Sequence, residues 1–225
     1  KLKVIDIVLL CDDSGSMTSM GSYDHTEHRY LSRWEELKRR TRIIMELAIT
    51  MDPDGIDIYF LNRPPLFHVN NISQIDLAFS IMPSGGTPLN KTFEQILHDK
   101  TRVAKEKKVL TVITTDGEPQ KILDDGTSVD GTKEFTNTLK YKRQPLKNWP
   151  VTIMLCTNDE KVMSKYRRID RNVKFVDVVG SYDHERQISG GTLTQATYVV
   201  KSLIGGVDEQ LDQTNEGSSC RCSVM

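Results

Sequence analysis

The stretch VIDIVLLCDDSGSM, residues 4–17, joins an apolar run directly to a cluster of small, oxygen-bearing side chains. Six of the seven residues from Val4 to Leu10 are apolar, which predicts a fully buried strand over Val4–Cys11. Two aspartates, two serines and a glycine follow at once. Such a loop after a buried strand is typical of a helix cap, a phosphate cradle, a catalytic aspartate or a metal site, and the rest of the chain has to distinguish them.

Apolar strand-like runs alternate with helical patterns along the chain. Further strands are expected over residues 56–62, 64–71, 108–115, 150–157 and 173–179, and helices over 33–51, 73–82, 87–106, 130–143, 159–170 and 192–204. Ser73 is the expected N-cap of its helix. The prolines of 64–71 favour a short antiparallel edge strand. The alternation predicts an α/β fold, with a doubly wound, mostly parallel six-stranded sheet and helices on both faces.

Length and charge limit the classes of function. The chain has 225 residues, of which 37% are hydrophobic, and we expect one domain over 1–205 followed by a polar, mobile tail over 206–225. Its 30 basic and 31 acidic residues give a net charge of −1, which offers no support for nucleic-acid binding. Basic clusters such as 140–143 and 165–168 are expected on solvated helix faces. No apolar run is long enough for a transmembrane segment.

Small oxygen-bearing residues recur where the predicted strands end. Asp12, Ser14 and Ser16 follow the first strand, Asp116 follows the strand at 108–115, and Thr87 begins a predicted helix between them. The carboxyl ends of parallel strands share one edge of a sheet, where ligands bind. Taken singly, each residue has an ordinary explanation, since serine and aspartate occur in turns and threonine caps helices.

In this order, the D-x-S-x-S pattern, the later threonine and the later aspartate resemble the von Willebrand factor type A (vWA) domain of intracellular type, with a complete metal-ion-dependent adhesion site (MIDAS). The resemblance extends over about residues 3–205. It implies a bound divalent cation, Mg²⁺ with Mn²⁺ or Ca²⁺ as alternatives, and the ligands Asp12, Ser14, Ser16, Thr87 and Asp116. It also implies a protein partner that supplies a Glu or Asp to the cation.

The residue types suit that chemistry. A hard cation prefers oxygen ligands, and Mg²⁺ takes six of them in an octahedron. Three hydroxyls and two carboxylates supply up to five, and the neutral hydroxyls leave the ion Lewis-acidic toward an anionic oxygen from a partner. We therefore expect a recognition module rather than an enzyme.

Neighbouring residues offer alternatives to this assignment. The motif SGGT occurs at 84–87 and again at 189–192, and the order of the motifs along the chain selects Thr87 over Thr192, which is expected to cap the last helix. Glu118 either lines the rim of the site or lies in a solvated turn. The polar segment 21–33 is expected to be a loop, unless it shapes the ligand surface.

Other functions remain as alternatives. Aspartyl-phosphate phosphatases need a second acid two residues after the nucleophile, where this chain has Ser14. The chain contains neither a phosphate-binding glycine motif nor a G-x-S-x-G elbow. A metal-free vWA scaffold for protein contacts and a metal-dependent hydrolase are the two alternatives that stay open.

The four cysteines indicate where in the cell the protein is expected to work. Cys222 begins a C-a-a-X ending whose terminal Met favours farnesylation, and Cys220 is a candidate for palmitoylation, so that the tail would tether the protein to a membrane; a chance ending is the alternative. The strand order of the vWA family implies that the strands of Cys11 and Cys156 lie two positions apart, too far for a disulfide. We therefore expect two free buried thiols and an intracellular, cytoplasmic protein.

Overall fold

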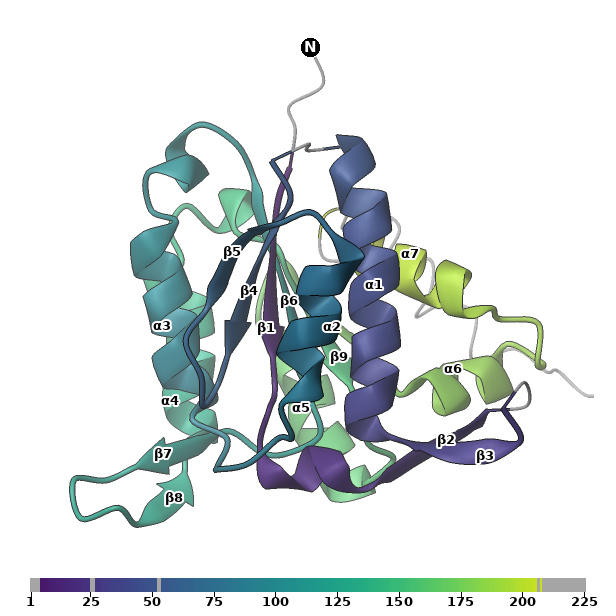
Figure 1. Ribbon diagram of the computed structural model, residues 1–225. Helices are drawn as coiled ribbons and strands as arrows, with labels where there is room; N and C mark the ends of the chain where they lie inside the picture. The colour runs from purple at the N-terminus through teal and green to yellow at the C-terminus, as the bar shows by residue number, and fades with distance from the viewer. Residues whose placement is uncertain (1–4, 25–26, 52–53, 206, 208–225) are drawn as a thin grey trace, which may run out of the picture.

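The computed structural model describes residues 5–24, 27–51, 54–205 and 207. Its centre is a six-stranded sheet with the order β10-β9-β6-β1-β4-β5 (Figure 1). The strands are β1 (Asp6–Cys11), β4 (Ile56–Phe60), β5 (Leu66–Val69), β6 (Val109–Thr115), β9 (Val151–Leu155) and β10 (Val176–Val179). Strand β5 is antiparallel to β4, and every other neighbouring pair in this sheet is parallel. The predicted α/β sheet is therefore confirmed.

Helices cover both faces of the sheet (Figure 1). One face carries α1 (Arg33–Met51), α2 (Ile72–Ser80) and α7 (Gln195–Gly205), with α6 (Tyr182–Ile188) beside them, and the other carries α3 (Leu89–Asp99), α4 (Thr132–Asn137) and α5 (Glu160–Asn172). Successive side chains of a strand point to opposite faces. In β1, Ile7 and Leu9 accordingly enter the first core, and Val8 and Leu10 enter the second.

The structure contains two short hairpins that the sequence patterns do not indicate. They pair β2 (Met20–Asp24) with β3 (Arg29–Ser32) and β7 (Gln120–Ile122) with β8 (Ser128–Asp130). In the first, the rings of Tyr23 and Tyr30 pack edge to face with centroids 5.1 Å apart. The backbone N–H and hydroxyl of Ser22 both donate to the carboxylate of Glu36 in α1. In the described part of the segment expected to be a loop, residues 21–24 and 29–32 therefore belong to paired strands.

Two helices differ from their predicted extents. The helix predicted over 87–106 begins at Leu89 and ends at Asp99, and a 3₁₀ turn, η2 (Val103–Lys105), follows it. The helix predicted over 130–143 is the short α4 continued by a π-helical turn, η3 (Thr138–Lys142). Two further 3₁₀ turns are η1 (Gly15–Thr18) and η4 (Leu146–Asn148).

Two predicted helix caps are wrong. The α2 helix is capped by Asn71, whose side-chain oxygen accepts a hydrogen bond from the N–H of Ser73 at 3.0 Å, and the side chain of Gln74 completes the capping box. In α7, the hydroxyl of Thr194 accepts from the N–H of Thr197 at 3.1 Å. The hydroxyl of Thr192 instead donates to the carbonyl of Ser189. In both cases a side chain at a neighbouring position caps the helix.

The cysteines divide between the sheet and the tail. Cys11 and Cys156 are free, buried thiols, as predicted. Burial raises the pKa of each to about 12. The tail predicted over 206–225, including the lipidation candidates Cys220 and Cys222, lies outside the described residues except for Val207. No helix in the described part of the chain is long and apolar enough to span a membrane.

Candidate functional site

The candidate site lies where β1 and β6 end side by side at the centre of the sheet. The two strands are parallel neighbours, and the N–H of Asp12 continues their ladder by donating to the carbonyl of Thr114 at 2.9 Å. The chain leaves β1 toward β4 on one side and later returns to β6 on the other. This edge is therefore the switch point at which doubly wound sheets bind ligands.

Asp12 is fully buried at this point, and its carboxylate is held from two sides. One oxygen accepts from the N–H of Ser14 at 2.9 Å, and the other accepts from the hydroxyl of Thr115 at 2.6 Å. Burial, followed by the nearby negative charge of Asp116, raises the pKa of Asp12 to about 6, against the lowering effect of those hydrogen bonds. Asp12 is thus a poorly solvated carboxylate near the carboxylate of Asp116.

Two serine hydroxyls connect the loop after β1 to Asp116. The hydroxyl oxygens of Ser14 and Ser16 are 3.1 Å apart, and Ser16 donates to one carboxylate oxygen of Asp116 at 2.8 Å. The 3₁₀ turn η1 produces this arrangement, because it curls the loop over the buried side chain of Met17. Four of the five predicted ligands therefore form one hydrogen-bonded cluster.

Thr87, the fifth predicted ligand, approaches the cluster from the loop before α3. It is buried, and its hydroxyl lies 3.5 Å from the position that a Cβ on Gly117 would occupy, next to Asp116. Its backbone N–H donates to the side chain of Gln120 at 2.9 Å. The N-cap of α3 is Pro88, so Thr87 lies one residue before the cap and does not begin the helix.

Backbone contacts hold the loop of Thr87 against the loop after β1. The N–H of Gly15 donates to the carbonyl of Gly85 at 3.1 Å, and the N–H of Ser84 donates to the carbonyl of Asp13 at 2.7 Å. Gly85 has a φ of +95°, and a Cβ there would meet the side-chain oxygen of Asn62 at 2.5 Å. This close approach requires a glycine at position 85.

Asp13 has a structural role in the same loop. One carboxylate oxygen accepts from the backbone N–H of Asn62 at 2.9 Å, and the other accepts from Nε of Arg63 at 2.8 Å. The guanidinium of Arg63 in turn lies over the ring of Phe60, 4.3 Å from its centroid. Asp13 therefore attaches the loop after β1 to the end of β4, consistent with its place outside the predicted ligand set.

Sequence reasoning missed two site residues, Arg33 and Thr115, whose hydroxyl donates to Asp12. Arg33 begins α1, and its Nη1 lies 2.5 Å from the second carboxylate oxygen of Asp116, whose side chain is 0% exposed. A signal was available, because a helix N-terminus disfavours cations and an arginine there needs a nearby anion. The guanidinium offsets part of the negative charge of the two buried carboxylates.

Glu118 lies at the rim and is not a solvated turn residue. Its carboxylate pairs with Lys165 of α5 and, at 3.5 Å, with Lys161. The hydroxyl of Tyr166 donates to the carbonyl of Gly117 at 3.0 Å. These contacts attach α5 to the loop that carries Asp116.

The oxygen atoms at the candidate site determine which kind of ion it suits. No group of three or more His, Cys, Asp or Glu side chains with the geometry of a metal site occurs among the described residues. The site combines two carboxylates with hydroxyls, which are the hard oxygen donors that Mg²⁺ and Mn²⁺ prefer. Two adjacent buried carboxylates, balanced only in part by Arg33, favour a cation, so the residues fit such an ion.

Comparison with known proteins supports the fold. No protein-family model and no curated protein sequence matches the chain. Among solved structures, a mutant of the PilB minor pilin from Streptococcus sanguinis superposes with a TM-score of 0.58 and 12% identity, over 98% of this chain and 64% of the pilin. The chain thus spans less than two thirds of that pilin.

Two further solved structures have a similar fold. The vWF domain of the type V pili tip protein Mfa5 from Porphyromonas gingivalis has a TM-score of 0.52 and 8% identity, with 98% of each chain covered. The pilus adhesin SpaC from Lactobacillus rhamnosus GG, in its open conformation, has a TM-score of 0.51 and 15% identity, over 90% of this chain and 31% of SpaC. At these identities the likeness concerns the fold alone: the chain has a vWA-like fold.

Proposed function

We propose that this chain is a protein-recognition module that binds a partner through a divalent cation. The cation is Mg²⁺, with Mn²⁺ or Ca²⁺ as alternatives, and its ligands are Asp12, Ser14, Ser16, Thr87 and Asp116. One observation carries the proposal: two buried carboxylates are linked at the carboxyl edge of the sheet, from Asp12 through the backbone N–H and hydroxyl of Ser14 to the hydroxyl of Ser16 and on to Asp116. The likeness to a pilus adhesin and to a pilus tip protein supports protein recognition.

The proposed ligands and their neighbours have different roles in recognition. Asp12 and Asp116 supply the negative charge, and the three hydroxyls supply neutral oxygens. When bound, the ion offers a Lewis-acidic position to a Glu or Asp of the partner. Thr115 and the N–H of Ser14 fix the orientation of the Asp12 carboxylate, and Asp13 keeps the loop in place.

A calorimetric titration tests this proposal. Mg²⁺ added to EDTA-stripped protein should bind saturably at one site, and Asp116→Ala should abolish binding because it removes one of two charged ligands. Asp124→Ala, which removes an exposed carboxylate outside the site, is the matched control and should bind like wild type. Equal binding by both variants would place the ion elsewhere and refute the assignment.

The metal-free scaffold remains a second candidate because of Arg33. Its ion pair with Asp116 already compensates one buried carboxylate without a metal. The absence of Mg²⁺ binding by wild type, together with retained binding of a protein partner, would favour this alternative. We propose no catalytic activity, since the similar structures are named as pilins and an adhesin.

We also propose that the protein works in a reducing, cytoplasmic environment. The two free thiols of Cys11 and Cys156, buried in the sheet region, support this proposal. Fractionation of cells that produce the protein, with detection by antibody, tests it. Recovery of the protein only outside the cell would refute it.

A further inference from the structure

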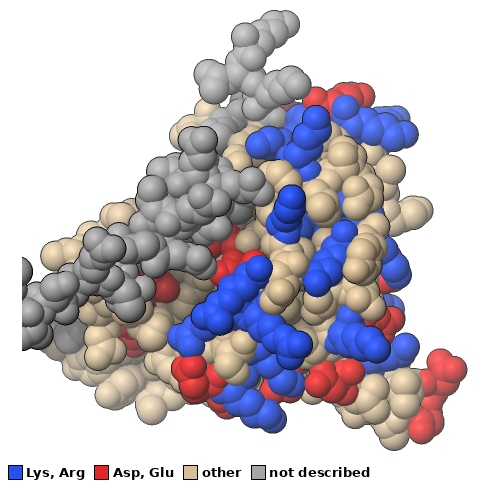
Figure 2. All heavy atoms as spheres, turned by 180° about the vertical axis from the view of Figure 1, so that it is seen from behind, with Lys and Arg blue, Asp and Glu red and all other residues tan. Residues whose placement is uncertain are grey.

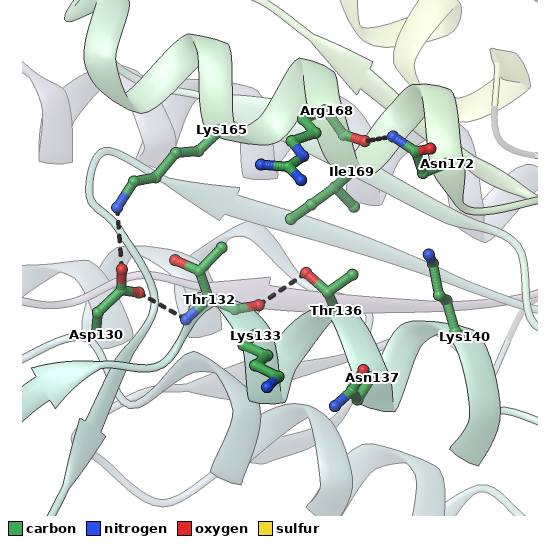
Figure 3. Close-up of a pocket in the computed structure, with 10 residues that line it drawn as sticks. All are labelled: Asp130, Thr132, Lys133, Thr136, Asn137, Lys140, Lys165, Arg168, Ile169 and Asn172. Carbon is green, nitrogen blue, oxygen red and sulfur yellow. Dashed lines mark hydrogen bonds and ion pairs between the residues drawn. The ribbon is translucent and has the colours of Figure 1, made fainter.

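A groove of about 470 Å³, lined mainly by polar and charged residues, lies between α4, with its extension η3, and α5 (Figure 3). Ile169, which is 4% exposed, contributes an apolar side chain to its lining. Four cationic side chains also line it, Lys133 and Lys140 on one wall and Lys165 and Arg168 on the other. Figure 3 shows Lys140 reaching across toward α5.

The groove carries a net positive charge. Lys165 pairs with Glu118 and, at 3.2 Å, with Asp130. Asp130 is the acidic residue of the lining, and its carboxylate also accepts from the N–H of Thr132 at 2.8 Å. Within the described part of the chain, Lys133, Lys140 and Arg168 make no ion pair. On the face seen in Figure 2, Lys and Arg clearly outnumber Asp and Glu.

The size of the groove limits its ligand. From Lys165 to Asn172, both in the lining, α5 rises about 10 Å. That length accommodates about three residues of an extended chain. None of the residues that line the groove is aromatic, so it offers no platform on which nucleic-acid bases would stack. The side-chain amide of Asn137 is suited to hydrogen-bond a peptide backbone, whereas Nδ2 of Asn172 already donates to the carbonyl of Arg168 at 2.6 Å.

We propose that the groove between α4 and α5 binds a short, extended acidic peptide segment of a partner protein. Carboxylates of that segment pair with Lys133, Lys140 and Arg168, whose charges are not compensated within the described chain. This inference goes beyond the proposed function, because such binding requires no cation at Asp12 and Asp116.

The groove is also close to the candidate metal site. Tyr166 and Lys165 of α5 contact Gly117 and Glu118, which directly follow Asp116. A partner that places one acidic residue at the site can therefore continue into the groove. Two anchoring points on one partner would raise its overall affinity.

The test measures fluorescence anisotropy of a labelled hexaglutamate peptide with the full chain in EDTA at low salt. EDTA removes any contribution of a bound cation. The groove variant combines Lys133→Glu, Lys140→Glu and Arg168→Glu, and it should weaken peptide binding about tenfold or more, because three attractive charges become repulsive. A hexaglutamine peptide should bind far more weakly than hexaglutamate.

The matched control makes the same change in net charge elsewhere, with Arg102→Glu, Lys105→Glu and Lys147→Glu. These three residues are exposed and lie away from the groove lining, so this variant should bind hexaglutamate within about twofold of wild type. Circular dichroism should show both variants folded. An equal loss in the two variants would mean that only net charge matters and would overturn the proposal. Tighter binding of a single-stranded hexanucleotide than of hexaglutamate would overturn the choice of a peptide.

Discussion

The guanidinium of Arg33 contacts the carboxylate of Asp116, which the sequence predicts to be a cation ligand. Nη1 of Arg33 and an oxygen of Asp116 are 2.5 Å apart, and the arginine side chain is 22% exposed. A divalent ion bound to Asp116 would repel this guanidinium. Arg33 should therefore compete with the metal for Asp116.

Replacement of Arg33 by an uncharged residue tests this competition. We expect Arg33→Gln to raise the Mg²⁺ affinity about fivefold to tenfold, since the ion no longer displaces an ion pair. Isothermal titration calorimetry measures the change. Arg33→Lys keeps the charge and should stay near wild type, and Arg167→Gln, which breaks the exposed pair with Glu160, is the control. A weaker affinity in Arg33→Gln would indicate that Arg33 supports the metal site instead.

Among the helices, α2 is capped by Asn71 and not by Ser73, the residue that the sequence pattern indicates. Asn71 accepts from the N–H of Ser73, and the hydroxyl of Ser73 also donates to Asn71, at 2.7 Å. Asn71→Ala should therefore lower the free energy of unfolding by about 1 kcal/mol, the usual value of an N-cap. Ser73→Ala should cost clearly less, because it leaves the cap in place. Urea denaturation of both variants measures the difference, and equal losses would contradict the assignment of the cap.

The elements that sequence patterns predict are mainly the buried ones, and the exposed edge strand β5 is an exception indicated by its prolines. Strands such as β1 and β6 are rich in apolar residues and buried almost throughout, because both faces of the sheet are covered. The hairpins β2–β3 and β7–β8 are short and mostly exposed, so no apolar alternation marks them. Contacts distant in sequence stabilise them, such as Ser22 with Glu36. Such contacts cannot be derived from local periodicity.

At the scale of the whole molecule, topology explains why the site was predictable in part. Strand order alone brings Asp12 and Asp116 together, since β1 and β6 are neighbours. Of the two SGGT threonines, Thr87 lies next to Gly117, whereas the hydroxyl of Thr192 donates to the carbonyl of Ser189. Arg33 was not predictable in this way: the sequence predicts the helix that it begins, but its contact with Asp116 joins residues distant in sequence through the packing of α1.

Burial in the folded protein also determines the pH at which the thiols of Cys11 and Cys156 ionise. Cys11 and Cys156 are buried, and desolvation raises the pKa of each to about 12. A raised pKa keeps these thiols protonated in the folded protein while unfolded thiols ionise above about pH 8.5. Their contribution to stability is therefore complete below that pH and is lost as the pH rises toward 12.

Thiol labelling measures this protection. In a background with Cys220→Ser and Cys222→Ser, we expect a thiol reagent at pH 8 to leave the native protein unmodified and to label two cysteines after denaturation in urea. Because access requires opening of the sheet region, labelling at intermediate urea should follow the unfolding transition seen by circular dichroism. Mass spectrometry counts the labels. Rapid labelling of either cysteine without denaturant would show that the sheet opens locally at that strand, independently of global unfolding.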